Sequence, residues 1–90
     1  MYLHLGQDIV VRTSDIIGIF DLDITTTSRK TRDFLTKCEK DGVVINVSDE
    51  LPKSFVICKS KYDMRHKVYI SQISPATLLK RTNFIKDLSL

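Results

Sequence analysis

The sequence predicts an α+β fold, a small β-rich domain of about six short strands and two short helices, from three observations. Six short runs rich in β-branched and aromatic residues are separated by polar or glycine-containing turns. Two other segments place apolar residues at helical spacing behind Ser or Thr. No strand-helix-strand rhythm repeats along the chain, which argues against a doubly wound parallel sheet.

The N-terminal region is predicted to contain three strands. Residues 2–5 and 8–12 would form two short strands joined at Gly6-Gln7 in a tight hairpin. Residues 16–22 would form the third, because this run is rich in β-branched and aromatic residues. The polar run 25–28 then breaks the strand pattern and supplies hydroxyls that can cap a helix.

A helix is predicted from Ser28 or Thr27 to about Lys40. Its core face has residues at positions i, i+3, i+4 and i+7, namely Thr31, Phe34, Leu35 and Cys38. Gly42 is the expected residue just beyond its C-terminus.

Three more strands are predicted at residues 43–47, 54–58 and 67–73, the last two as a hairpin around residues 62–66. Ser74-Pro75 would begin a short helix that runs through Arg81. The tail, residues 83–90, has apolar residues at near-helical spacing and is expected to dock on the rest of the domain.

Two of the predicted strands are apolar on successive residues, at Val43-Val44-Ile45 and at Phe55-Val56-Ile57. Both faces of the sheet would therefore be apolar there, and two short helices cannot cover both. We expect a homo-oligomer whose neighbouring subunits cover the second face. The alternative is a sheet that curls into a small closed core.

Length and composition favour one cytoplasmic domain over residues 1–90. No apolar run approaches the length of a membrane span, and the N-terminal residues read as a strand, so no membrane partner is expected. Cys38 and Cys58 lie in apolar segments, where free thiols pack as small hydrophobes, which favours a reducing compartment.

Charge is distributed unevenly about the net value of +3. Residues 1–50 contain nine acidic and six basic residues, whereas residues 51–90 contain two acidic and eight basic residues. Such asymmetry suits an anionic partner, most commonly nucleic acid. Scattered lysines also keep proteins in solution, and that explanation stays open.

Signatures of catalysis are weak. The run from Ile17 to Thr25 contains Asp21-Leu22-Asp23-Ile24-Thr25, the D-x-D-x-T pattern of aspartyl-phosphate phosphatases. That chemistry needs further residues on a much larger doubly wound domain, so Asp21 and Asp23 are interpreted as polar residues at a strand end. No His or Cys spacing suits a metal. We expect no enzyme activity, no cofactor and no small-molecule substrate.

Two groups of cations are the candidate DNA-binding residues. Arg29, Lys30 and Arg32 lie in the first turn or so of the predicted helix, where the helix dipole disfavours positive charge. Departures of this kind are typical of functional sites, although a solvated face is the alternative. The second group lies on and near the predicted hairpin, where protection of a strand edge is the alternative: Lys53, Lys59, Lys61, Arg65 and Lys67. Lys80 and Arg81 are interpreted as charges at a helix C-terminus.

Six stretches, in order, resemble a known family. They are residues 1–6, 10–12, 15–21, 31–35, 53–57 and 68–81, the last reading Val-Tyr-Ile-Ser-Gln-Ile-Ser-Pro-Ala-Thr-Leu-Leu-Lys-Arg. The chain resembles the RemA/RemB family of bacterial extracellular-matrix regulators, the RemB type most closely. The resemblance implies a fold similar to LytTR-type DNA-binding domains, assembly into a ring, and activation of biofilm-matrix genes through contact with DNA.

One departure from the family pattern limits what the resemblance implies. The RemA branch has consecutive arginines of its DNA-contacting set where this chain reads Glu50-Leu51-Pro52, and only Lys53 is retained. The predicted function is an oligomeric DNA-binding transcriptional regulator of extracellular-matrix genes that contacts the phosphate backbone of double-stranded DNA. The alternative is a homo- or hetero-oligomerising interaction protein that does not bind DNA directly.

Overall fold

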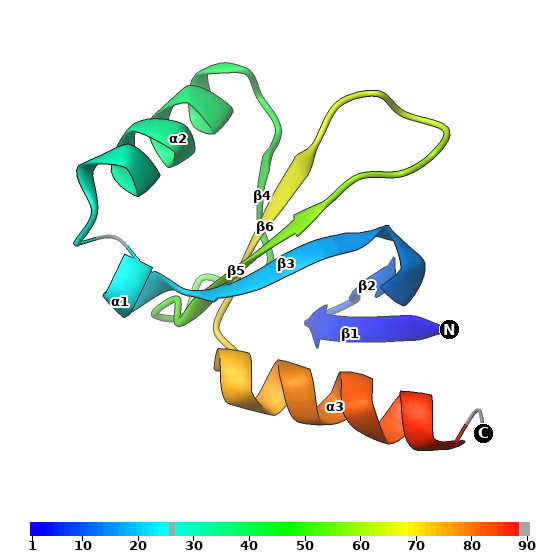
Figure 1. The fold of residues 1–90 in the computed structure, drawn as a ribbon. Coiled ribbons are helices and arrows are strands. Elements are labelled where there is room, and N and C mark those ends of the chain that lie inside the picture. The colour runs from blue at the N-terminus through cyan, green and yellow to red at the C-terminus, as the bar shows by residue number, and fades with distance from the viewer. Residues whose placement is uncertain (26, 89–90) are drawn as a thin grey trace.

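In the computed structural model, which describes residues 1–25 and 27–88, a four-stranded sheet lies between a two-stranded hairpin on one face and a helix on the other (Figure 1). The strands are β1 (Tyr2–Gly6), β2 (Ile9–Arg12), β3 (Ile16–Asp21), β4 (Val44–Asn46), β5 (Ser54–Cys58) and β6 (Lys67–Ser71). The helices are α1 (Leu22–Thr25), α2 (Arg29–Lys40) and α3 (Pro75–Leu88), and a 3-10 turn, η1 (Thr13–Asp15), connects β2 to β3. All six predicted strands are confirmed.

The four-stranded sheet has the order β3-β5-β6-β4. β5 pairs antiparallel with both β3 and β6, and the pairing with β6 confirms the predicted hairpin. β4 pairs with β6 in parallel, so β3 and β4 are the edge strands of this sheet. β1 and β2 form a separate antiparallel hairpin.

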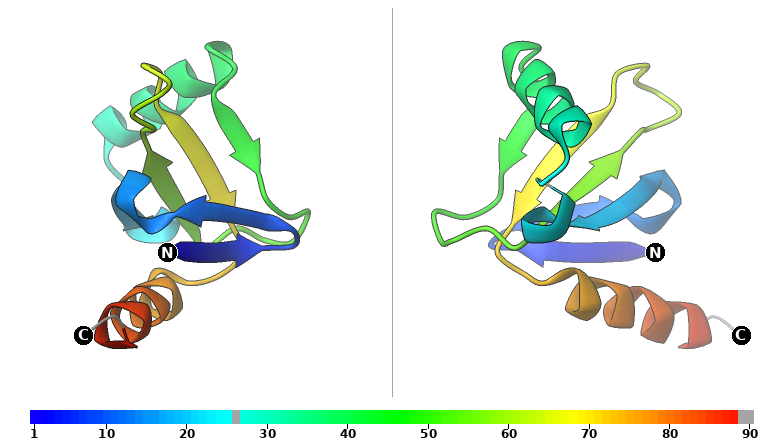
Figure 2. Two further views of the ribbon diagram at one scale, coloured as in Figure 1. Left: turned by 90° about the vertical axis from the view of Figure 1, so that its right-hand side faces the viewer. Right: turned by 60° about the vertical axis from the view of Figure 1, so that its left-hand side comes forward.

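Two apolar cores lie on opposite faces of the four-stranded sheet. One contains Val56 and Cys58 of β5, packed against Leu3 and Leu5 of β1 and Leu78 of α3. The other contains Phe55 of β5, Val68 of β6 and Cys38 of α2, and Phe20 and Leu35 pack against them. The views in Figure 2 show α2 on one side of the sheet and the hairpin and α3 on the other.

The β1–β2 hairpin is joined to the sheet by a buried polar contact. Ser71 Oγ donates to the carbonyl oxygen of Leu5 at 2.6 Å and accepts from the N–H of Ile73 at 3.0 Å. Its cross-strand neighbour Ser54 donates to the carbonyl of Ile73 at 2.8 Å. Both serines are fully buried, and their hydroxyls are therefore satisfied by backbone groups.

β3 carries an irregularity that shapes the α2 face. The register shifts between Ile16 and Gly18, which leaves Ile17 as an extra residue that is exposed. A Cβ atom at Gly18 would lie 2.6 Å from the ring of Phe20, so glycine there allows this ring to lie along the strand. Phe20 stacks on Phe55, with ring centroids 5.0 Å apart.

Most predicted elements are confirmed, including α2 with its expected C-terminal glycine, Gly42, at φ +73°. Three predictions were wrong in detail. Leu22 begins the short helix α1 and does not end β3. The last strand stops at Ser71, and the C-terminal helix continues past Arg81 to Leu88. The side chains of residues 83–90, on which the predicted docking of the tail depends, lie outside those that the structure describes.

The second apolar face of the sheet is covered within the chain. The sequence predicted that neighbouring subunits would cover it, because it predicted only two short helices. In the structure the β1–β2 hairpin and α3 occupy this position, since the first two strands form a separate layer and do not extend the sheet. That face therefore provides no reason for self-association.

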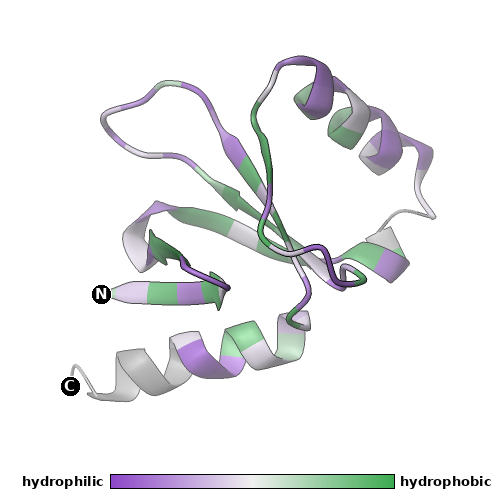
Figure 3. Ribbon diagram, turned by 180° about the vertical axis from the view of Figure 1, so that it is seen from behind, coloured by the Kyte–Doolittle hydropathy of each residue, from purple (hydrophilic) through white to green (hydrophobic). Residues whose placement is uncertain are grey.

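Among the described residues, no helix is both long enough and apolar enough to cross a membrane. Figure 3 shows hydrophobic residues along the strands, and hydrophilic residues on α2 and on the loops.

Candidate nucleic-acid interface

The first turn of α2 brings three of the predicted cations onto one exposed surface. Arg29, Lys30 and Arg32 are all exposed, and this turn contains no acidic residue. Arg29 Nε lies 4.0 Å from a carboxylate oxygen of Asp33, but both side chains are mostly in solvent, where such a pair contributes little. The guanidinium of Arg32 donates to the carbonyl of Thr27 at 3.2 Å, which orients it toward the start of the helix.

The N-terminus of α2 has no side-chain cap. Ser28 has the extended conformation of an N-cap residue, yet its hydroxyl makes no capping hydrogen bond. N–H groups of the first turn therefore point outward without the side-chain acceptor that serine commonly supplies. An N–H array combined with cationic side chains is suited to bind a phosphate group.

Lys53 lies at the same end of the sheet as the start of α2. Its carbonyl accepts from the N–H of Leu22 at 3.0 Å, and its own N–H donates to the carbonyl of Ser71 at 2.9 Å. The backbone of Lys53 is thus held between α1 and the end of β6, and its side chain is exposed. The structure places Lys53 beside α1 and apart from the hairpin cations with which the sequence had grouped it.

The hairpin cations gather at the opposite end of the sheet. Lys59, Lys61 and Arg65 belong to the loop between β5 and β6, Lys67 begins β6, and all four are exposed. The ammonium group of Lys61 lies 5.1 Å from the ring centroid of Tyr62, within the range of a cation–π contact. Lys59 and Lys61 do not lie on a strand, because β5 ends at Cys58 before the first of them.

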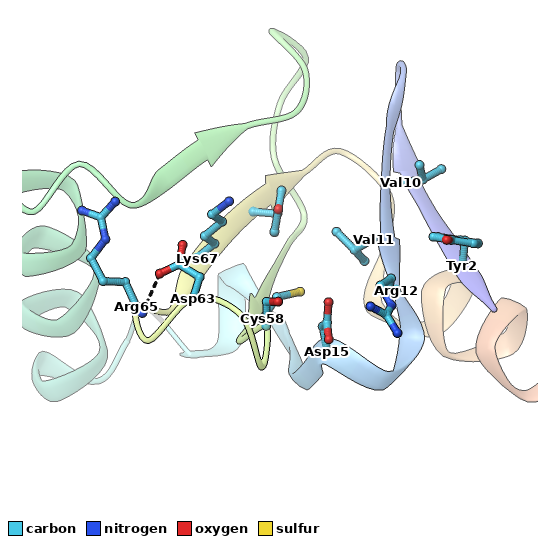
Figure 4. Close-up of a pocket in the computed structure, with 11 residues that line it drawn as sticks. Tyr2, Val10, Val11, Arg12, Asp15, Cys58, Asp63, Arg65 and Lys67 are labelled. Carbon is cyan, nitrogen blue, oxygen red and sulfur yellow. Dashed lines mark hydrogen bonds between the residues drawn. The ribbon is translucent and has the colours of Figure 1, made fainter.

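Arg12 joins this group, although no pattern in the sequence singles it out. It lies at the end of β2, which the chain connects to the start of β3 beside the β5–β6 loop. Arg12 lines a hollow of about 200 Å³ together with Asp15, Asp63, Arg65 and Lys67. In Figure 4, Arg12 and Asp15 lie on one side of this hollow, and Asp63, Arg65 and Lys67 lie on the other. A lone arginine at a strand end carries no signal in the sequence, since only the fold brings it near the loop.

The eight predicted DNA-binding residues therefore form two sets at opposite ends of the four-stranded sheet. One set lies at the start of α2 and beside α1, and consists of Arg29, Lys30, Arg32 and Lys53. The other lies at the β5–β6 loop, and consists of Lys59, Lys61, Arg65 and Lys67. The sequence also predicted two groups, but it grouped Lys53 with the cations of the hairpin, whereas the fold places Lys53 with those of α2.

Asp21 has a structural role in the D-x-D-x-T segment. One of its carboxylate oxygens accepts the N–H of Ile24 at 3.0 Å, so Asp21 caps the short helix α1. β3, which carries it, is an edge strand that pairs antiparallel, unlike the central parallel strand that a phosphatase of this motif requires. Within residues 1–25 and 27–88, no group of three or more His, Cys, Asp or Glu side chains is placed to hold a metal ion.

The two cysteines are buried and free. Burial raises the pKa of the Cys58 thiol to about 11, and the charge of Asp15 adds to the effect. Burial also raises the pKa of the Cys38 thiol, with Asp41 as the next cause. Both thiols are protonated at neutral pH, so they act as packing groups and not as nucleophiles.

Residues 2–82 match the protein family described as "RemA-like: Extracellular matrix regulatory protein A-like". The chain belongs to this family. Within the family, "Extracellular matrix regulatory protein B" from Bacillus subtilis (strain 168) is 40% identical over 88 residues, 98% of each chain. The resemblance identified from the sequence is confirmed, and the RemA-like match ends at residue 82, inside α3.

Proposed function

We propose that this RemA-like protein is a homo-oligomeric transcriptional regulator of extracellular-matrix genes that binds double-stranded DNA through its phosphate backbone. The observation that carries the proposal is the first turn of α2, which has three exposed cations and an N-cap residue whose side chain makes no capping hydrogen bond. Positive charge at a helix N-terminus costs about 0.3 to 1 kcal/mol for each residue. An anionic ligand removes that cost, and DNA phosphates are the ligand that suits a regulator of gene expression.

Lys53 would extend the phosphate-binding surface from α2 to the start of β5. Its backbone is anchored on both sides, so its exposed side chain projects from a fixed point. Glu50-Leu51-Pro52 precedes it, and Glu50 would face unfavourable charge from a nearby phosphate. We therefore expect the DNA surface to extend from α2 as far as Lys53 and to exclude Glu50.

The experiment is a gel-shift titration of duplex DNA at several salt concentrations with Arg29→Ala/Lys30→Ala/Arg32→Ala. We expect weaker binding to all duplex sequences alike, because backbone contacts carry no sequence information. The slope of log K against log salt should become shallower by about 0.9 for each phosphate that the variant no longer neutralises. Fold stability should hold or rise, since the helix dipole disfavours these charges.

The matched control removes three other exposed cations, in Lys37→Ala/Lys40→Ala/Lys80→Ala. Two of these lie in the last turn of α2, where the dipole favours them. Arg81 is left intact, because it donates to the carbonyl of His4 at 3.2 Å. Each variant is first checked for an intact oligomer, since loss of multivalency would weaken binding by itself. Equal losses of affinity in the two variants, or an unchanged salt slope in the first, would refute the α2 surface as the site of DNA binding.

A second candidate function is an interaction protein that oligomerises without touching DNA. The β4–β5 loop favours it, because Leu51 is 82% exposed between two carboxylates and a proline, a composition that suits a protein partner. Wild-type protein that oligomerises and shows no salt-dependent DNA binding would establish this alternative over the first.

A further inference from the structure

Two adjacent hollows at the β5–β6 end of the sheet have no task in the proposed function. The first, of about 200 Å³, lies between the end of β2 and the β5–β6 loop (Figure 4). The second, of about 450 Å³, is more open and shares Arg12, Asp15 and Ser60 with the first as lining residues. Together the two reach the size of small-molecule sites, which is about 300 to 1,000 Å³.

Hydrogen bonds hold the two sides of these hollows in place. The N–H of Lys59 donates to the carbonyl of Asp15 at 2.9 Å, which ties η1 to the start of the β5–β6 loop. Within the loop, the N–H of Asp63 donates to the carbonyl of Ser60 at 3.2 Å, and the Asp63 carboxylate accepts the N–H of Arg65 at 3.0 Å. The hollows are therefore formed before a ligand arrives, which lowers the entropic cost of binding.

Cations line both hollows, and ion pairs do not neutralise them. Two half-buried carboxylates, those of Asp15 and Asp63, face five exposed basic side chains: Arg12, Lys59, Lys61, Arg65 and Lys67. In the part of the chain that the structure describes, the one ion pair within 4.0 Å joins Arg29 to Asp33 on α2. Excess positive charge at a concave surface attracts an anion, because walls of low dielectric strengthen the field.

The floor of the smaller hollow is apolar and largely closed to water. Val11 and Cys58 line it, and their side chains are 7% and 5% exposed. Tyr69 lines the same hollow, and burial raises the pKa of its hydroxyl, so this group stays protonated and can donate a hydrogen bond. Tyr2 and Val10 add apolar surface at the edge. A flat ring placed on this surface would leave water for an apolar environment.

We propose that the two hollows form a binding site for a nucleotide. The phosphate group lies in the more open hollow, where Arg12, Lys59 and Lys61 supply charge-assisted hydrogen bonds. The base lies over the apolar floor of the smaller hollow, and the carboxylate of Asp15 accepts its N–H groups. An anion without N–H donors would only be repelled by the carboxylates, and an uncharged ring would leave the cations unused, so the lining selects a ligand with both parts.

The same lining suits a free nucleotide better than duplex DNA. The phosphates of a duplex lie on a convex surface, whereas these cations line a concave one, and Asp15 and Asp63 would repel the backbone. The N–H groups that bases use in pairing are also inaccessible in a duplex. The inference goes beyond the proposed function and does not depend on it, because it gives the cations of the β5–β6 loop a task that the cations of α2 do not share.

Isothermal titration calorimetry of the full-length protein tests the site, with GMP as the probe. GMP has a phosphate group and a base with two adjacent N–H donors, which suit the two oxygens of one carboxylate. Guanosine and inorganic phosphate, titrated separately, each supply one part of this ligand. We expect GMP to bind at least about tenfold more tightly than either, because cations and floor then contribute together.

Two variants remove charge from the phosphate end of the site, and a third is their control. Arg12→Gln and Lys59→Gln/Lys61→Gln should each weaken GMP binding by about tenfold or more, since each loses hydrogen bonds to a charged group. The control, Lys40→Gln/Lys80→Gln, removes two exposed lysines that line neither hollow, and it should bind GMP as the wild type does. Circular dichroism first establishes that all variants are folded.

Asp15→Asn tests the part of the site that recognises the base. The substitution removes a negative charge and keeps the backbone carbonyl to which Lys59 donates. GMP binding should weaken by about tenfold, because a charged acceptor of its N–H groups is lost. Inorganic phosphate should bind at least as tightly as before, because a repulsive charge is gone. Equal weakening of both ligands would contradict the placement of the base beside Asp15.

Several results would overturn the nucleotide site. They are a wild-type protein that does not bind GMP, and equal losses in the site variants and the control. Equal affinity for GMP and inorganic phosphate would indicate an adventitious ion only. Loss of duplex binding in Lys59→Gln/Lys61→Gln, with no GMP binding by the wild type, would assign the hollows to DNA instead. A wild type that binds GMP and not duplex DNA refutes the proposed function and supports this site.

Discussion

At the scale of single residues, Asp21 shows that a short motif depends on the backbone around it. Its carboxylate accepts the N–H of Ile24, three residues ahead, and begins a helical turn. The same residue in a phosphatase would lie at the end of a central parallel strand, with its carboxylate free to attack phosphorus. The edge position of β3 and the cap on α1 replace that role with a structural one.

We expect Asp21→Asn to retain the cap and the stability of the wild type, because asparagine caps as well as aspartate. Asp21→Ala should lower the free energy of unfolding by about 0.5 to 2 kcal/mol through loss of the cap. Urea denaturation measures both. Hydrolysis of an aryl phosphate with Mg²⁺ serves as the functional readout, and turnover in the wild type that disappears in Asp21→Asn would restore the phosphatase interpretation.

The cations at the start of α2 could be found from the sequence, and Arg12 could not. The start of the helix can be predicted from Ser28 and from the apolar spacing after it. The helix dipole disfavours positive charge at this position, which makes Arg29, Lys30 and Arg32 stand out. Arg12 gains its role from residues that are distant along the chain, because the β5–β6 loop is brought beside the end of β2 only in the folded state. Sequence patterns within one element therefore identify the cations of α2, whereas only the tertiary structure identifies Arg12.

At the scale of elements, the β1–β2 hairpin is the part whose place the sequence predicted least well. Its strands were predicted correctly, since alternation and Gly6 indicate a hairpin. Apolar runs in β5 showed that both sheet faces are buried, but they could not show what covers each face. A separate layer and a neighbouring subunit produce the same pattern of apolar residues.

The Ser71 hydroxyl should contribute measurably to holding this layer on the sheet. We expect Ser71→Ala to lower the free energy of unfolding by about 1 to 3 kcal/mol, because the buried carbonyl of Leu5 and the N–H of Ile73 both lose a partner. Ser14→Ala, at an exposed position in η1, is the control and should be near neutral. Equal stability of the two variants in urea would show that water replaces the hydroxyl.

At the scale of the whole molecule, the fold distributes charge differently from the order of charges along the chain. The sequence showed that the C-terminal half is basic. The fold then places cations of the β5–β6 loop at one end of the sheet and carboxylates of the β4–β5 loop at the other. Arg29, Lys30, Arg32 and Lys53 lie at the same end as those carboxylates, so both ends of the sheet carry cations that an anionic ligand could contact.

The sheet order also sets the sequence in which the molecule can fold. Val68 of β6 pairs on one side with Ile57 across the β5–β6 loop, and on the other with Val44 of the parallel edge strand. The first pairing closes a short loop, whereas the second must bring together segments far apart in the chain, at a larger entropic cost. The antiparallel pair should therefore form early, and β4 should join the sheet after the main barrier.

Stopped-flow folding of Ile57→Val and Val44→Ala compares the two pairings. We expect Ile57→Val mainly to slow folding, with a φ value well above 0.5, and Val44→Ala mainly to speed unfolding, with a φ value near 0. The reverse pattern would place the parallel pairing in the nucleus. With the expected pattern, the β5–β6 hairpin that carries Lys59, Lys61 and Arg65 belongs to the folding nucleus, so this cationic surface would be among the earliest parts of the molecule to form.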